Sequence, residues 1–128
     1  MNTALSSKDL ESVLLEKREI LQSICQAMRV QLIEVGLQDN LNTLPRPELA
    51  QYSLRIDPFD SSETLFGIWR DQHGNQTGEI QVHSSGRVYA EADVVRNHPK
   101  DGRWFVEAVT AWGNGDDIKT ELRLLPAL

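Results

Sequence analysis

The segment SKDLESVLLEKREILQSICQAMRVQLIEVG, residues 7–36, decides the first half of the fold, because its apolar side chains recur every three to four positions. That spacing places them on one face of a helix. Ser6 or Ser7 can cap this helix with Asp9 as a capping-box partner, and Gly36 suits the left-handed turn that ends a helix. The apolar stripe consists of Leu10, Val13, Leu14, Leu21, Ile24, Cys25, Met28, Leu32 and Val35.

A helix over residues 7–36 would be about 45 Å long at 1.5 Å per residue, whereas a ten-residue strand reaches only about 33 Å. The helix is therefore expected either to bend over the sheet or to project beyond it. A projecting apolar stripe would need a partner, and a second copy of the chain is the simplest one. The alternation in residues 30–35 leaves a second interpretation, in which the helix stops near Met28 and a strand begins.

After a linker over residues 37–48, apolar and polar residues alternate from about residue 49 to residue 126. Short connections that carry Gly, Asn, Asp or Pro separate the runs, which is typical of neighbouring antiparallel strands. We therefore predict a single α+β domain, residues 1–128, with one long N-terminal helix packed on an antiparallel meander sheet of five or six strands. The strands are expected at about residues 52–56, 64–70, 78–83, 87–95, 103–112 and 118–125.

The turn at residues 84–86 fits a three-residue hairpin loop with its glycine in the left-handed conformation. This register pairs Val82 with Val88 on one face and Glu79 with Glu91 on the other. Like charges directly opposite each other destabilise a sheet, so such a pair can serve to hold a cation, a basic partner or a shared proton. The alternative is that solvent or nearby arginines neutralise the pair, or that the register differs by one residue.

Two further registers complete the predicted outer face, which is the sheet surface turned away from the helix. A five-residue turn at residues 113–117 pairs Glu107 with Arg123, and the longer connection before it places Glu91 beside Glu107. Aromatic residues near this row favour contact with a partner, and cover by the linker or the chain ends is the alternative. The candidate binding residues of the outer face are Trp69, Glu79, Tyr89, Glu91, Phe105, Glu107 and Arg123. The inner face is expected to hold Phe66 and Ile68, together with the pairs Val94–Trp104, Ala92–Val106 and Trp112–Ile118.

The composition is that of an acidic globular chain, with 128 residues, 40% hydrophobic and 25% charged, and a formal net charge of −6. A negative chain without a basic cluster is repelled by phosphate backbones, so we expect no nucleic-acid partner. No apolar stretch is long enough for a membrane span, and the first residues lack the pattern of a secretory signal. We therefore expect no membrane partner and a cytoplasmic location.

Motifs that carry chemistry are weak in this chain. Cys25 lies on the apolar stripe of the helix, which favours a core residue over a nucleophile. The three histidines lack the close spacing of metal ligands, and no phosphate loop, dinucleotide fingerprint or nucleophile elbow is present. We therefore predict no catalytic residue, no metal site and no cofactor.

These patterns favour a small interaction module that is cytoplasmic and homodimeric, and that self-associates or binds another protein through the outer face or the helix stripe. One alternative binds a small apolar ligand between helix and sheet, in a pocket lined by Trp104, Trp112 and Phe66. A second, less favoured alternative is an enzyme that uses the carboxylates of the outer face. The size, acidity and helix-on-sheet plan resemble those of small bacterial secretion chaperones, but this chain lacks their second and third helices, so no residue role is carried over.

Overall fold

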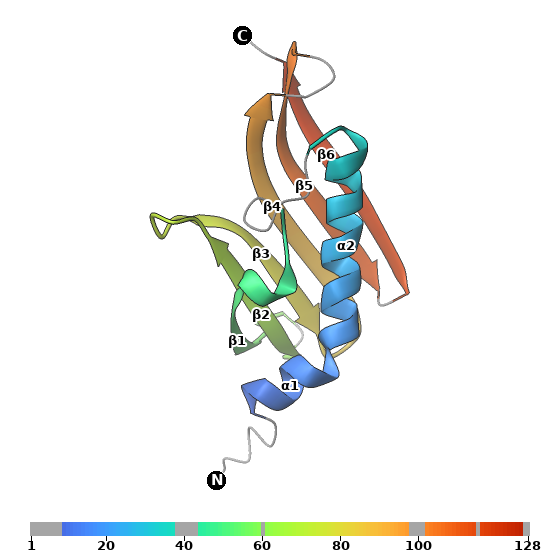
Figure 1. Ribbon diagram of the computed structural model, residues 1–128. Coiled ribbons are helices and arrows are strands. Elements are labelled where there is room, and N and C mark those ends of the chain that lie inside the picture. The colour runs from blue at the N-terminus through green and yellow to red at the C-terminus, as the bar shows by residue number, and fades with distance from the viewer. Residues whose placement is uncertain (1–8, 38–43, 60, 98–101, 115, 127–128) are drawn as a thin grey trace.

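The computed structural model describes residues 9–37, 44–59, 61–97, 102–114 and 116–126, with the helices first and the sheet after them (Figure 1). The helices are α1 (Leu10–Glu16) and α2 (Arg18–Glu34), and the 3-10 turn η2 (Pro47–Leu49) precedes the sheet. The strands are β1 (Gln51–Ile56), β2 (Glu63–Arg70), β3 (Gln76–His83), β4 (Arg87–Asn97), β5 (Trp104–Asn114) and β6 (Asp117–Pro126).

The six strands form one antiparallel sheet in the order β1-β2-β3-β4-β5-β6, so each strand pairs with its neighbour in the chain. The helix α2 packs along β5 and β6 on one face of this sheet (Figure 1). This arrangement confirms the predicted α+β fold, with a long N-terminal helix on an antiparallel meander. It also defines two faces, an inner face that α2 covers and an outer face on the other side.

The predicted single helix is divided at Lys17, whose backbone takes φ −96° and ψ 6°. Of the two expected outcomes for so long a helix, the structure shows the bend: α1 turns toward β1, while α2 continues along the sheet (Figure 1). With 17 residues, α2 is about 25 Å long, which is within the length of a strand. The break therefore removes the mismatch in length between helix and sheet.

The helix begins later than expected. The cap of α1 is Asp9, whose carboxylate accepts a hydrogen bond from the backbone N–H of Ser12 at 2.8 Å. This bond lowers the pKa of the Asp9 carboxyl, because it stabilises the charged form. Ser6 and Ser7, which the sequence favoured as caps, lie outside the described residues.

The helix ends where the sequence predicted, at Gly36, which has φ 98°. The Gly36 N–H donates to the carbonyl of Ile33 at 2.8 Å, and the Leu37 N–H donates to the carbonyl of Leu32 at 3.0 Å. This pair of bonds is the Schellman motif, which satisfies the last helix carbonyls and requires a left-handed residue. The alternative in which a strand begins after Met28 is therefore wrong, because α2 continues to Glu34.

The core lies between the stripe of α2 and the inner face of the sheet. The α2 side chains at its centre are fully or almost fully buried, and the sheet presents mainly Ile, Val and Ala to them. Alanine on the central strands lets the helix approach closely, so the two surfaces fit without large side chains between them. The core residues of α2 are Leu21, Ile24, Cys25, Met28 and Leu32, and those of the sheet include Ile80, Val82, Val88, Ala90, Val106, Val109 and Ala111.

The predicted register of the β3–β4 hairpin is confirmed, with Val82 opposite Val88 and Glu79 opposite Glu91. The turn glycine, Gly86, has φ 98° as expected. A short turn leaves few ways to align two strands whose inner faces must both be apolar, which is why this register could be predicted.

The registers of β5 were predicted less well. Pairing in the β5–β6 hairpin continues to Asn114 and Asp117, so the turn is shorter than the expected five residues and Trp112 lies opposite Lys119 rather than Ile118. A bulge between Val106 and Ala108 then restores the predicted pairing of Val106 with Leu124. Ala92 lies opposite Val109, so the predicted pairs Ala92–Val106 and Val94–Trp104 are wrong. A second bulge, between Asp93 and Arg96, shifts the β4–β5 register further along the strands.

Strand β2 has the opposite orientation to the prediction. Leu65 and Trp69 face α2 and belong to the core, whereas Phe66 and Ile68 lie on the outer face. Gly67 explains the choice, because a side chain added there would lie 2.7 Å from the ring of Tyr52. The small residue therefore has to be on the inner face, where the Tyr52 ring packs over the strand.

Candidate functional site

The outer face is the candidate functional site, because no described helix or loop packs over its centre. Cross-strand pairing arranges its side chains in rows that run across the sheet. We call one of these the aromatic row and the next the acidic row. The aromatic row is Phe66, Gln81, Tyr89, Trp112 and Lys119, and the acidic row is Ile68, Glu79, Glu91, Thr110 and Glu121.

The aromatic row carries a partly exposed apolar surface. Trp112 is 38% exposed, and it lies directly opposite Tyr89. At the β1 side of the row, the guanidinium of Arg55 lies 3.8 Å from the centre of the Phe66 ring, which is a cation–π contact. The row therefore already holds one arginine against an aromatic ring, and it leaves Trp112 available for a further contact.

The acidic row holds the two opposed carboxylates that the sequence predicted. Glu79 lies directly opposite Glu91, and Gln81 donates a hydrogen bond from its Nε2 to a Glu79 carboxylate oxygen at 2.7 Å. The pKa of the neighbouring Tyr89 hydroxyl is raised, first by partial burial and then by the negative charges of Glu91, Glu79 and Asp93. The field on this part of the outer face is therefore negative.

Of the predicted site residues, Glu79, Tyr89 and Glu91 lie together on the outer face. Glu107 and Arg123 join them at the β5–β6 side, where Arg123 Nε donates to a Glu107 carboxylate oxygen at 2.6 Å. This contact was predicted as a directly opposed pair, but the bulge places Arg123 opposite Ala108 and the two side chains still meet. Glu91 lies beside Thr110, so the predicted proximity of Glu91 and Glu107 along one row is wrong.

Two predicted residues do not join the outer face. Trp69 is 6% exposed and lies in the core, where its indole N–H donates to the carbonyl of Arg46 at 2.9 Å. Its placement on the outer face was wrong because β2 presents its other side to solvent. The backbone of Phe105 is part of β5, but its side chain lies outside the described residues.

Trp112 was not among the predicted residues of the outer face, because the predicted pair Trp112–Ile118 placed it on the inner face. Its opposite partner Tyr89 identifies the correct side, since Val88 and Ala90 on either side of Tyr89 are buried in the core. A shorter β5–β6 turn, with Asn114 opposite Asp117, pairs Trp112 with Lys119. A prediction that used this turn would have placed Trp112 on the outer face.

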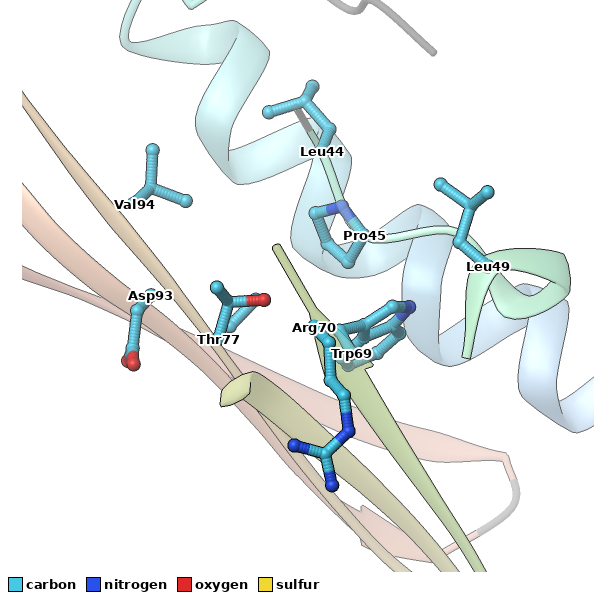
Figure 2. Close-up of a pocket in the computed structure, with 9 residues that line it drawn as sticks. Leu44, Pro45, Leu49, Trp69, Arg70, Thr77, Asp93 and Val94 are labelled. Atoms are coloured by element: carbon cyan, nitrogen blue, oxygen red, sulfur yellow. The ribbon is translucent and has the colours of Figure 1, made fainter. Parts of the chain in front are cut away.

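The core fills the centre of the space between α2 and the sheet, and a hollow of about 290 Å³ lies at its edge, where Ile20 and Ser23 of α2 approach Val82. The predicted ligand-binding residues do not line this hollow. Phe66 and Trp112 are on the outer face, and Trp104 is 38% exposed. Figure 2 shows a pocket at the rim instead, where the segment before η2 crosses β2, β3 and β4. Its volume is about 90 Å³, well below the roughly 300–1,000 Å³ of ligand sites. It is lined by Leu44, Pro45, Leu49, Trp69, Arg70, Thr77, Ala92, Asp93 and Val94.

A buried polar cluster lies at the other end of the sheet, around His83. His83 Nδ1 is 3.0 Å from Thr64 Oγ1 and 3.5 Å from Asp57 Oδ2, and Arg87 is 3.5 Å from the same Asp57 oxygen. Both the hydroxyl and the carboxylate therefore approach the same ring nitrogen. In a hydrolase triad, one ring nitrogen of the histidine contacts the nucleophile and the other contacts the carboxylate. The His83 cluster lacks this arrangement, so its contacts are those of a cluster that connects β2, β3 and the end of β1.

Cys25 and the residue types that bind metals are the remaining chemical candidates. Cys25 is fully buried, and burial raises the pKa of its thiol to about 12. The reactive thiolate is therefore not formed near neutral pH. Among the described residues, no group of three or more His, Cys, Asp or Glu side chains is placed to hold a metal ion.

Comparison with family models, curated proteins and solved structures finds no match to this chain. No described helix is long and apolar enough to cross a membrane. The properties of the outer face are therefore the basis for a functional proposal.

Proposed function

We propose that this protein is a small interaction module that binds a basic segment of a partner protein on its outer face. The observation that supports the proposal is the juxtaposition of the aromatic row with the acidic row on a sheet surface whose centre no described helix or loop covers. Aromatic side chains bury much area at low entropic cost, and the neighbouring carboxylates select the sign of the partner.

The charge balance of the outer face favours a cationic partner. Its carboxylates include Glu79 and Glu91, whose neighbours along the acidic row are Ile68 and Thr110 and supply no positive charge. The nearby cations already have contacts: Arg55 lies over Phe66, Arg123 is bonded to Glu107, and Lys119 lies 3.4 Å from Asp117. An arginine-rich or lysine-rich segment would relieve the repulsion between Glu79 and Glu91, and its stems can lie over the aromatic row.

The same charge balance opposes self-association through the outer face. A two-fold axis through this face would bring the acidic row of one copy against that of another, and like charges at an interface disfavour binding. An enzyme that uses Glu79 and Glu91 is also poorly supported, because these carboxylates lie on an open sheet surface and acid–base chemistry needs a cleft that excludes water.

The test uses a labelled arginine-rich peptide that contains two tryptophans, with a second peptide in which glutamate replaces each arginine. We expect saturable binding of the basic peptide in fluorescence anisotropy at low salt, weakening as salt rises. The double variant Glu79→Gln with Glu91→Gln should raise the dissociation constant of the basic peptide about tenfold. Trp112→Ala should also raise it.

The matched control removes two carboxylates from the helices instead, by Glu11→Gln with Glu19→Gln, and it should leave binding unchanged. Equal binding of the basic and acidic peptides, or equal loss in the helix control, would contradict the proposal. If the basic peptide binds the outer-face variants as tightly as it binds the wild type, its binding site is not on the outer face.

We propose further that the module is a homodimer. Among the described strands, β1 and β6 each pair on one side only, so the sheet has two open edges. Native mass spectrometry of untagged protein taken directly from cells tests this, because it reports the number of chains and any retained molecule together. A two-chain mass supports the homodimer, a one-chain mass opposes it, and an added small mass would favour the apolar-ligand alternative.

A further inference from the structure

The open edge of β6 carries charges of alternating sign on the outer face. In chain order they are Asp117, Lys119, Glu121 and Arg123, and each side chain is exposed. The side-chain exposures of Asp117, Lys119 and Arg123 are 75%, 61% and 65%. Every second N–H and C=O of an edge strand points away from its neighbour and is free to pair with another strand.

We infer that β6 pairs with β6 of a second copy, antiparallel, around a two-fold axis that passes between the two Thr120 residues. In this register Asp117 lies opposite Arg123 of the second copy, and Lys119 lies opposite Glu121 of the second copy. The symmetry repeats both pairs, so all four charges meet an opposite charge. On the inner face, Ile118 lies opposite Leu122 of the second copy.

The alternating charges distinguish this register from its neighbours. Directly opposed residues must lie on the same face, so the strands can slide only in steps that keep the faces matched. The next register on one side places Lys119 opposite Lys119, and the next on the other side places Glu121 opposite Glu121. Opposed like charges are destabilising and opposed unlike charges are stabilising, so the sequence of β6 selects the Thr120-centred register.

Charges on an edge strand commonly prevent pairing with unrelated strands. The charges of β6 therefore disfavour pairing with a strand that lacks the complementary charges. A second β6 has these charges, so pairing with it is favoured. The other edge does not have such a pattern. Around Ser53, self-pairing of β1 would place Gln51 opposite Arg55, with no ion pair. A β1–β6 contact between copies would be head-to-tail and would not close into a dimer.

The position of α2 is compatible with this dimer. The helix contacts both β5 and β6. In the dimer the two α2 helices would therefore lie on the same face of the joined sheet, one on each side of the junction. The two outer faces would join into one continuous surface with two acidic rows. The inference rests on the homodimer of the proposed function and specifies its interface.

Sedimentation equilibrium of the untagged full chain tests the register through charge reversal. Lys119→Glu places an acid opposite Glu121 of the second copy, and Glu121→Lys places a base opposite Lys119 of the second copy. Each change replaces two attractive pairs by two repulsive ones, so we expect each to weaken dimerisation about tenfold. The double variant restores both pairs and should dimerise like the wild type.

A mixture of the two single variants should form a mixed dimer more tightly than either variant forms its own, because every pair in the mixed dimer is again opposite in sign. This rescue excludes misfolding as the reason for weak single variants. The matched controls Arg18→Glu and Glu48→Lys make the same changes in charge beside Tyr52, at the β1 edge of the sheet and away from β6, and they should leave the dissociation constant of the dimer unchanged.

The outcomes separate this inference from the proposed function. A wild-type chain that is monomeric throughout overturns both the interface and the homodimer. A wild-type dimer that is indifferent to both reversals, or that the double variant fails to restore, overturns the β6 interface and leaves the homodimer standing. Binding of the basic peptide to the outer face is a separate measurement, so its failure would not depend on either result.

Discussion

Trp69 and Trp112 are the same residue type on opposite faces of one sheet, so replacing each by alanine tests the assignment of the faces. Trp69 is 6% exposed, and its indole N–H is bonded to the carbonyl of Arg46. Trp112 is 38% exposed on the outer face. We expect Trp69→Ala to lower the free energy of unfolding by about 4 kcal/mol, and Trp112→Ala by about 1 kcal/mol or less.

The magnitudes follow from what each ring contacts. Truncation of a buried tryptophan costs about 3–5 kcal/mol, and loss of its hydrogen bond to Arg46 contributes about 1 kcal/mol of such a total. The Trp69 ring packs on Gly78, where its Cε3 atom lies 3.1 Å from the position of an added Cβ. Gly78 has no side chain that can move into the vacated space. Trp112 loses mainly a cross-strand contact with Tyr89, worth about 0.2–1 kcal/mol.

Urea unfolding followed by far-ultraviolet circular dichroism measures both effects without relying on tryptophan fluorescence. Thermal unfolding gives a second measurement: at about 4 °C per kcal/mol for a chain of this size, Trp69→Ala should lower the Tm by about 15 °C. Trp69→Phe, which keeps a ring and removes the donor, should fall between this variant and the wild type. Equal losses for the two alanine variants, or a larger loss for Trp112→Ala, would refute the assignment of faces.

Three further predictions concern single positions. Gly67→Ala should cost at least about 2 kcal/mol in urea unfolding, because the new Cβ would lie 2.7 Å from the Tyr52 ring, and retention of full stability would contradict the orientation of β2. Glu91→Gln should raise the free energy of unfolding at neutral pH by about 0.5 kcal/mol at low salt, because it removes the charge opposite Glu79, and the gain should shrink at high salt. The raised pKa of Cys25 makes the folded state favour the thiol, so stability should be full below the unfolded pKa and should fall as the pH rises from 9.0 toward about 12. Comparison with Cys25→Ala in urea unfolding isolates this slope, and an identical slope in that variant would contradict it.

The part of the fold that could be predicted rests on local patterns. The stripe from Leu21 to Leu32 predicted the long helix and its buried face, and Gly36 predicted its end. The short turn with Gly86 predicted the β3–β4 register and the opposed pair Glu79–Glu91. In each case the signal lies within a few residues of the structure it specifies, so the sequence pattern is sufficient.

The part that could not be predicted depends on contacts between distant segments. Strand β2 has apolar residues on both sides, so alternation alone does not distinguish Phe66 and Ile68 from Leu65 and Trp69. The Tyr52 ring decides, because it packs against Gly67. The break at Lys17 likewise depends on where the sheet lies, since α1 turns toward β1.

The candidate site divides in the same way. The sequence by itself determined that Glu79 faces Glu91 beside Tyr89, because one tight turn aligns those strands. Only the tertiary structure brought Trp112 onto the outer face and moved Trp69 into the core. The bulge between Val106 and Ala108 turns Trp112 to the outer face, and the Tyr52 ring against Gly67 sets the side of β2 that carries Trp69. Both effects depend on pairing or packing between separate strands, so no short stretch of sequence specifies them.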